Sequence, residues 1–309
     1  MIALAEPVER EPAGAVRARH PHFSASALNA YSECERKWYY RYVCAAVEDP
    51  GSSASAYGSA FHLALERLHE KYVRPRPDDE AAMLHDVQRQ IETAFAEYRE
   101  GFPTAIEFEL ALRRALRTAR RYVQWVAAES QRAPFTVVGR ELAVKLEADG
   151  FSFVGYIDRL DRDERSGAVT IVDYKTGTIA TSAAEYLECV RTYDDFQLPF
   201  YYWARTAAGD RVCRIALLPL KSALVDVKPV SLEVVPVPAG SAKRDALTGT
   251  IGIAELERAR KRMLDICREL TSSDPRSFPA TSDPSACVYC AYVNACVRRP
   301  PPEGERFSR

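Results

Sequence analysis

Hydrophobic residues follow two different patterns along the chain. Before residue 133 they recur every three or four positions, which is the spacing of one face of an α-helix. This pattern predicts helices at residues 24–43, 58–72, 79–100 and 105–130. Ser24 or Ser26 can cap the first of these helices, because a serine hydroxyl accepts a hydrogen bond from a free amide of the first turn.

From residue 135 onward, short segments rich in β-branched and aromatic residues replace this pattern. Turn signals at Asp149-Gly150 and near Ser166-Gly167 separate them, which predicts consecutive antiparallel strands at 135–148, 151–161 and 168–174. Further helices are expected at 182–190, 194–207 and 252–272, and further strands at 211–220 and 225–237. This order of elements predicts an α/β (α+β) fold in which helices flank a central mixed sheet.

The composition is that of a packed globular protein. Of the 309 residues, 47% are hydrophobic and 28% are charged, which is enough apolar material for a core. The formal net charge of -1 excludes a polybasic protein but leaves room for a local basic patch. One side of the predicted helix 105–130 carries such a ridge, which is either a solvated face or a surface for the DNA backbone. It consists of Arg113, Arg114, Arg117, Arg120 and Arg121.

A single domain over residues 22–300 accounts for the predicted elements. Prolines and a glycine without any periodicity indicate a flexible leader over 1–21, and we expect a flexible tail over 301–309. Within the domain, the helices of about 75–132 are expected to form an insertion. We find neither a secretory signal nor an apolar run long enough to span a membrane, so we expect a cytoplasmic protein with no membrane partner.

Acidic residues at the ends of two predicted strands are the strongest chemical signal. Asp158 ends one strand and Asp173 the next, so a hairpin between them would bring the two carboxylates together. Because buried carboxylates repel each other, such a pair normally needs a cation. Lys175 lies two residues after Asp173 and therefore on the same face of its strand. The set suits phosphodiester hydrolysis with Mg²⁺ or Mn²⁺; the alternative is a surface salt bridge at strand ends.

Two helical segments offer further candidate side chains. His62 could complete a metal shell, with Glu66 one turn later as a supporting group, although a lone helical histidine is more often structural. Gln197 and Tyr201 are four residues apart and share a helix face. They could bind phosphate or orient the metal shell, whereas the alternative is a packed tyrosine beside an exposed glutamine.

Eight cysteines are more than a chain of this length needs for stability. Cys287, Cys290 and Cys296 form a C-x2-C-x5-C pattern, and Cys34 lies far upstream. Four thiolates suit Zn²⁺ or an Fe–S cluster, and the spacing alone does not separate these from free thiols. The remaining cysteines are expected to be buried, small apolar residues, with Cys44 as the only substitute for Cys34. They are Cys44, Cys189, Cys213 and Cys267.

Taken in order, these segments resemble the PD-(D/E)XK nuclease superfamily, and within it the RecB-like branch that includes the AddB nuclease domain and the CRISPR-adaptation nucleases. The matching pieces span about residues 23–297. They are Phe23-Ser24-Ala25-Ser26-Ala27-Leu28 through Cys34, Trp38-Tyr39-Tyr40-Arg41-Tyr42, Gly58-x-x-x-His62, Gly155-x-x-Asp158-Arg159, Asp173-Tyr174-Lys175-Thr176-Gly177, Gln197-x-x-x-Tyr201 and the terminal cysteines. One departure is Glu35, where relatives commonly have proline.

The resemblance implies a restriction-endonuclease-like fold and a set of site residues. It makes His62, Asp158 and Asp173 metal ligands, together with the backbone carbonyl of Tyr174. It makes Lys175 the catalytic lysine and places Gln197 and Tyr201 in the active site. It also implies a 4Fe-4S cluster that joins Cys34 to a segment at 284–298. Its ligands would be Cys34, Cys287, Cys290 and Cys296.

The expected function is therefore a metal-dependent DNA nuclease. An exonuclease acting on single-stranded or unwound DNA ends is favoured, because the resemblance is to end-processing enzymes in repair, recombination or phage- and CRISPR-type DNA processing. A helicase is a candidate partner. The first alternative is a non-catalytic DNA-binding Fe–S module of a helicase–nuclease complex. The second is a zinc-stabilised interaction protein in which the acidic residues form only salt bridges.

Overall fold

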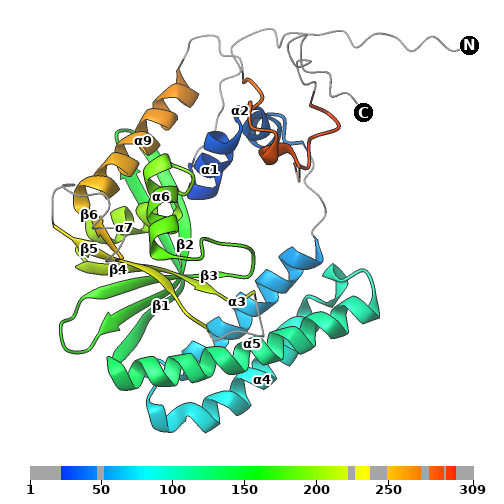
Figure 1. The fold of residues 1–309 in the computed structure, drawn as a ribbon, viewed down its shortest axis with the longest axis vertical. Coiled ribbons are helices and arrows are strands. Elements are labelled where there is room, and N and C mark those ends of the chain that lie inside the picture. The colour runs from blue at the N-terminus through cyan, green and yellow to red at the C-terminus, as the bar shows by residue number, and fades with distance from the viewer. Residues whose placement is uncertain are drawn as a thin grey trace, which may run out of the picture.

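A mixed β-sheet lies at the centre of the computed structural model, with helices on both of its faces (Figure 1). The structure describes residues 22–46, 52–221, 227–236, 249–272, 278–288 and 290–296. The leader predicted at 1–21 and the tail predicted at 301–309 lie outside these residues.

The described part of the sheet contains six strands in the order of the chain. They are β1 (Phe135–Ala148), β2 (Phe151–Asp163), β3 (Val169–Lys175), β4 (Val212–Pro219), β5 (Val230–Val235) and β6 (Thr250–Gly252). The first three strands form the predicted antiparallel meander. β3 and β4 run parallel, β4 and β5 antiparallel, and β5 and β6 parallel. The mixed sheet confirms the predicted fold class, and only the three-residue strand β6 was not expected.

The helices match the predicted segments with one break, and the helix predicted from Gly58 begins earlier, at Ser53. Their bounds are α1 (Ala25–Glu33), α2 (Glu35–Trp38), the π-turn η1 (Tyr39–Val43), α3 (Ser53–Lys71), α4 (Glu80–Glu97), α5 (Ala105–Arg132), α6 (Ala183–Thr192), α7 (Gln197–Ala207) and α9 (Ile253–Thr271), with short 3-10 turns η2 (Pro77–Asp79), η3 (Arg99–Gly101) and η4 (Ser285–Cys287). The single helix predicted at 24–43 is wrong, because Cys34 leaves the helical conformation with φ -163° and ψ 114°.

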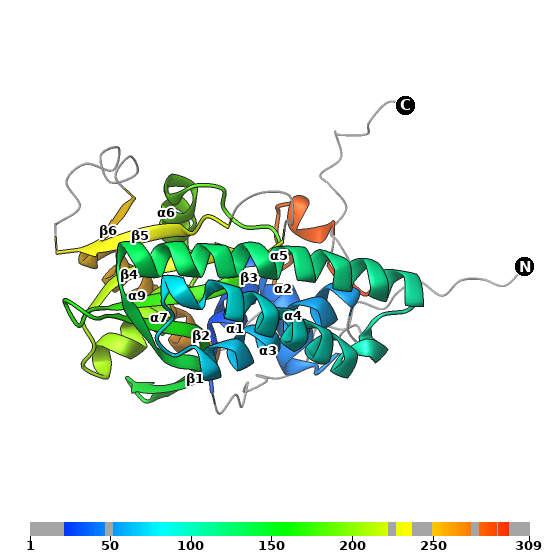
Figure 2. The ribbon, with the colours of Figure 1, turned by 90° about the horizontal axis from the view of Figure 1, so that it is seen from below.

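Two hydrophobic cores lie on opposite faces of the sheet (Figures 1 and 2). One joins α1, α6, α7 and α9 to strand residues such as Ile157 and Ile171. The other joins α3, α4 and α5 to Val172 and Tyr174. The chain is thus a three-layer sandwich. The region 75–132 supplies α4 and α5 to the second layer; that it is an insertion relative to compact relatives stays a prediction.

Helix α5 has one buried and one basic side. Ala115, Ala119 and Val126 are fully buried, whereas the predicted arginine ridge lies on the outer side with four of its five members exposed. Arg113 pairs with Glu109 of the same helix. No helix in the described part of the chain, the long α5 included, is apolar enough to cross a membrane.

Candidate active site

The predicted acidic residues lie on neighbouring strands. Arg159 of β2 pairs with Val172 of β3, so that Asp158 is level with Asp173. Both carboxylates are buried, with 9% and 1% of their residue surfaces exposed. The backbone amide of Tyr174 donates a 2.5 Å hydrogen bond to Asp158 Oδ2, which ties β2 to β3. The prediction that Asp158 ends its strand is wrong, because β2 continues past it to Asp163.

Glu141 of β1 is a site residue that the sequence analysis missed. The β1–β2 register aligns Arg140 with Arg159 and Leu142 with Ile157, so Glu141 lies opposite Asp158. One signal for it was present: the predicted Asp149-Gly150 turn fixes the hairpin register, and counting back from the turn pairs position 141 with 158. No motif pointed to Glu141, because a single glutamate in a strand carries no pattern of its own.

His62 of α3 completes a group that can hold a metal ion. Its Nδ1 lies 3.4 Å from Glu141 Oε1 and 3.5 Å from Asp158 Oδ1. One ligand atom from each of the three residues lies within 4.8 Å of the others. An imidazole nitrogen and two carboxylate oxygens form a donor set suited to a divalent transition-metal ion such as Mn²⁺ or to Mg²⁺.

A glycine lets α3 approach the sheet closely enough for this contact. A Cβ added to Gly58, one turn before His62, would lie 3.1 Å from the hydroxyl of Thr176, just beyond β3. The His62 ring then meets the ring of Tyr174 edge to face, at a centroid distance of 5.5 Å. The predicted Gly58-x-x-x-His62 spacing therefore has a steric basis: the glycine makes room, and the histidine reaches the carboxylates of β1 and β2.

The charges around His62 outweigh its burial. Burial alone would lower the pKa of the imidazole, but hydrogen bonds to Asp158 and Glu141 and their negative charge raise it to about 10. The two carboxylates thus stabilise a positive charge at this position, here the proton on His62. A divalent cation would be stabilised in the same way and would displace that proton.

Lys175 and Asp173 form a second, adjoining pair. Lys175 Nζ lies 2.7 Å from Asp173 Oδ2. Burial raises the pKa of Asp173 to about 7; Lys175 opposes the shift, and the nearby Asp158 carboxylate adds to it. Burial disfavours the Lys175 ammonium, yet the charge and hydrogen bond of Asp173, together with the charges of Asp195 and Asp158, outweigh burial and raise the pKa of Lys175. The lysine is therefore held as a cation beside two carboxylates.

Helix α7 holds this lysine in place. Lys175 Nζ donates a 2.6 Å hydrogen bond to Gln197 Oε1, and Gln197 Nε2 donates to the hydroxyl of Tyr201 at 3.2 Å. Gln197 and Tyr201 thus share a helix face, as predicted. Gly155 permits this packing, because a Cβ added there would lie only 2.8 Å from Phe200 and 3.0 Å from Tyr201.

The cysteines predicted to bind a cluster line one pocket, apart from the acidic site. The pocket contains Cys34, Cys287, Cys290 and Cys296, all with free thiols. The two distant segments dock there (Figure 1): the amide of Thr281 donates to Cys34 Sγ, and the Arg36 amide donates to the carbonyl of Pro279.

The other cysteines are outside this pocket. Cys267 is buried as expected, and Cys189 and Cys213 are half-buried. The expectation of a buried Cys44 is wrong, because its side chain is exposed at the end of the π-turn. Cys44 is not among the residues that line the pocket.

The geometry therefore combines a metal-ligating group, a cationic lysine and a glutamine that holds the lysine, all around Asp158 of β2 and Asp173 of β3. No curated protein matches the chain. A family model of the PD-(D/E)XK nuclease superfamily matches residues 22–297, which is most of its length. The chain belongs to the PD-(D/E)XK nuclease superfamily.

Proposed function

We propose that this protein is a metal-dependent deoxyribonuclease of the RecB-like, AddB-like branch, which acts as an exonuclease on single-stranded or unwound DNA ends. The observation that carries the proposal is the Lys175 ammonium, 2.7 Å from the buried Asp173 carboxylate and next to the His62, Glu141 and Asp158 group. A buried carboxylate, a lysine and a metal-ligating group at one place match the needs of phosphodiester hydrolysis.

One group of site residues would bind the metal ion, and a second group acts on the attacking water and the phosphate. His62, Glu141, Asp158 and Asp173, with the carbonyl of Tyr174, would hold Mg²⁺ or Mn²⁺. When bound, the ion lowers the pKa of a coordinated water and neutralises charge on the phosphate. Lys175 orients the attacking water and stabilises the developing negative charge. Gln197 and Tyr201 keep the lysine in position through the hydrogen bonds described above.

A 4Fe-4S cluster bound by Cys34, Cys287, Cys290 and Cys296 is the second part of the proposal. The shared pocket supports it, and Arg36 and Lys37 line the same pocket, where their positive charge would offset that of the thiolates. The cluster would stabilise the fold by joining segments that are about 250 residues apart, since closing a long loop restricts the unfolded chain.

A role in repair, recombination or phage- and CRISPR-type DNA processing follows from the end-processing activity. A helicase is the proposed partner, because unwinding would supply the single strands. The near-neutral charge of the chain fits a protein that a partner loads onto DNA.

The test is a cleavage assay with anaerobically purified protein. End-labelled linear and circular single-stranded DNA are incubated with Mg²⁺ or Mn²⁺, or with a chelator, and Asp173→Ala serves as the inactive control. Metal-dependent loss of linear but not circular DNA supports the exonuclease. Cleavage of circles would show an endonuclease. Binding without cleavage under all conditions would instead support the DNA-binding module.

A further inference from the structure

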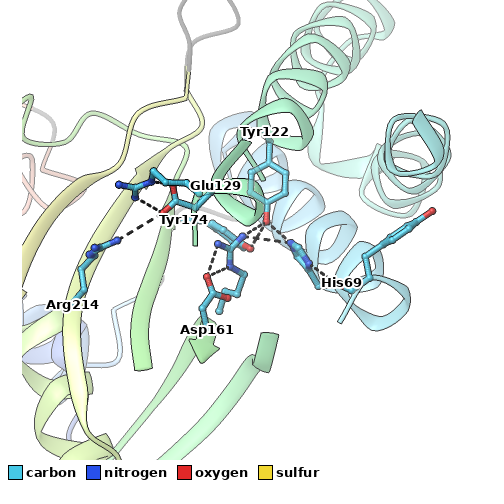
Figure 3. Close-up of polar contacts among 9 residues, drawn as sticks. His69, Tyr122, Glu129, Asp161, Tyr174 and Arg214 are labelled. Atoms are coloured by element: carbon cyan, nitrogen blue, oxygen red, sulfur yellow. Dashed lines mark hydrogen bonds and ion pairs between the residues drawn. The ribbon is translucent and has the colours of Figure 1, made fainter. Parts of the chain in front are cut away.

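A fully buried polar network lies in the core between the sheet and helices α3 and α5 (Figure 3). Its centre is the hydroxyl of Tyr122 on α5. This oxygen lies 2.5 Å from His69 Nε2, 2.6 Å from a guanidinium nitrogen of Arg159 and 2.9 Å from the hydroxyl of Tyr174. Arg159 also forms a 2.7 Å ion pair with Asp161.

The donors and acceptors of this network can be assigned. Burial and the charge of Arg159 lower the pKa of His69 to about 3, so its imidazole is neutral. Nδ1 of His69 faces the carbonyl of Tyr72 and must carry the proton, which leaves Nε2 as an acceptor. Tyr122 therefore donates to His69, and its oxygen accepts from Arg159 and Tyr174. Every hydrogen and lone pair of the Tyr122 hydroxyl is in use.

The network joins the same elements that carry the proposed active site. His69 lies two turns after His62 on α3, and Arg159 directly follows Asp158 on β2. Tyr174 lies between Asp173 and Lys175 on β3. Its side chain packs in the α3–α5 core, while Lys175 points to α7. Each partner of Tyr122 is thus coupled through a short piece of backbone to a residue of the site.

Stability alone does not account for a buried ion pair at this place. Arg159 is 1% exposed and lies against the rings of Trp125 and Phe135. Apolar residues of similar volume are often equally or more stable than such a pair, so we infer that the pair serves the geometry of the elements that it joins. Asp161 Oδ1 has no hydrogen-bond partner in the described structure, but the bonds around Tyr122 join α3, α5, β2 and β3 and restrict how these elements lie against one another.

We propose that Tyr122 is a positioning residue of the nuclease: its hydroxyl fixes α3 against β2 and β3 and thereby sets the distances among His62, Glu141 and Asp158 that metal binding requires. This inference rests on the proposed function. Tyr122 is fully buried and is not a member of the metal-ligating group; it acts through His69, Arg159 and Tyr174. Because the Tyr174 amide donates a hydrogen bond to Asp158 Oδ2, fixing the position of Tyr174 also fixes the position of the Asp158 carboxylate.

The test compares Mn²⁺ binding by full-length variants, measured from the electron paramagnetic resonance signal of free Mn²⁺. Tyr122→Phe keeps the ring and removes the hydroxyl, and we expect its Mn²⁺ affinity to fall about tenfold, the usual effect of losing a group that orients a ligand. The KM for DNA should stay unchanged, because the hydroxyl is buried in the core, while kcat falls.

Two controls separate positioning from stability. Tyr57→Phe on α3 removes a buried hydroxyl that lies outside this network, and it should leave Mn²⁺ affinity unchanged. Val126→Ala, one turn after Tyr122 and fully buried, should destabilise the same core but bind Mn²⁺ within twofold of the wild type. Should Tyr122→Phe not fold, Tyr174→Phe carries the test, since it removes only the bond between the two hydroxyls.

The outcomes are distinct. Reduced Mn²⁺ affinity in Tyr122→Phe or Tyr174→Phe, with both controls intact, supports the inference. Wild-type affinity in these variants, or an equal loss in Val126→Ala, overturns it. A wild-type protein that binds no Mn²⁺ would instead count against the proposed function itself.

Discussion

At the scale of single residues, Glu141 shows how the site is built. Its φ of 38° lies in the left-handed region, although it is not a glycine. That conformation costs about 1–2 kcal/mol, and in it Glu141 Oε1 lies 3.4 Å from His62 Nδ1. Backbone strain of this kind is concentrated at functional sites, where the surrounding structure maintains it. Glu141 therefore belongs with the proposed metal ligands.

Replacing Glu141 with glutamine tests this assignment. Glu141→Gln removes one negative charge from the group, so we expect Mn²⁺ affinity to fall by about tenfold or more. The matched control is Glu147→Gln in the same strand, which is exposed and whose carboxylate interacts with Ser152 and Lys145, away from the metal-ligating group. Isothermal titration calorimetry on both variants decides the matter, and equal affinities would remove Glu141 from the ligand set.

At the scale of elements, glycines set the distances between helices and sheet. Gly155 of β2 and Gly58 of α3 lie where a Cβ would meet a neighbouring side chain. They let α7 and α3 approach the sheet from its two faces, and these helices carry Gln197 and His62. The spacings in Gly58-x-x-x-His62 and Gly155-x-x-Asp158 thus reflect the packing of the helices as well as the chemistry of the site.

Gly155→Ala should displace α7. The added methyl group would lie 2.8 Å from the buried ring of Phe200, and overpacking of this kind costs about 1–3 kcal/mol. We expect a lower free energy of unfolding in urea and slower DNA cleavage, because Gln197 moves away from Lys175. Gly177→Ala, where a Cβ would meet nothing within 4 Å, is the control for stability. Equal stability of the two variants would refute the steric explanation.

The buried His69 should make the free energy of unfolding depend on pH under acidic conditions. Its pKa is about 3 in the folded chain and about 6.5 when unfolded. As the pH falls below 6.5 the unfolded chain takes up a proton that the folded chain does not, so stability is complete above pH 6.5 and declines toward pH 3. At pH 5 the loss is about 2 kcal/mol.

This loss can be measured by urea unfolding at pH 8 and pH 5 with chelator present. The wild type should lose about 2 kcal/mol more than His69→Gln between the two values, since the other titrating groups are common to both proteins. The same pH dependence in both would contradict a neutral, buried His69.

The sequence predicted most elements and the neighbouring positions of Asp158 and Asp173, because strand patterns and turn residues are local signals. It did not reveal the break at Cys34, where a contact from Thr281 is made across more than 240 residues. It also did not reveal the buried polar network around Tyr122, because in the sequence one tyrosine on a helix looks like any other core residue. Contacts between segments that are far apart in the sequence can be identified only in the folded structure.

At the scale of the whole molecule, the two ends of the described chain meet. Trp38 and Tyr39 stack on Phe278, and the hydroxyl of Tyr40 donates to the carbonyl of Ala295. The cysteine pocket lies at this junction. A cluster there would hold the first and last described segments together and so constrain the entire domain.

Cys290→Ser should therefore weaken the whole fold. Loss of one ligand should lower the iron and sulfide content, remove the brown colour and reduce the melting temperature by about 5 °C or more. Cys44→Ser, at an exposed thiol that does not line the pocket, should change none of these. Zinc in place of iron in the anaerobically prepared wild type would rule out the cluster.

We propose that Lys175 acts in phosphodiester hydrolysis beside a metal held by His62, Glu141, Asp158 and Asp173. The most direct measurement is the single-turnover rate of linear DNA cleavage by Lys175→Met, compared with Lys145→Met at an exposed position of β1. We predict a loss of about 100-fold or more for Lys175→Met, with Mn²⁺ binding retained and the control unaffected. A cleavage rate for Lys175→Met equal to that of the wild type would contradict the account.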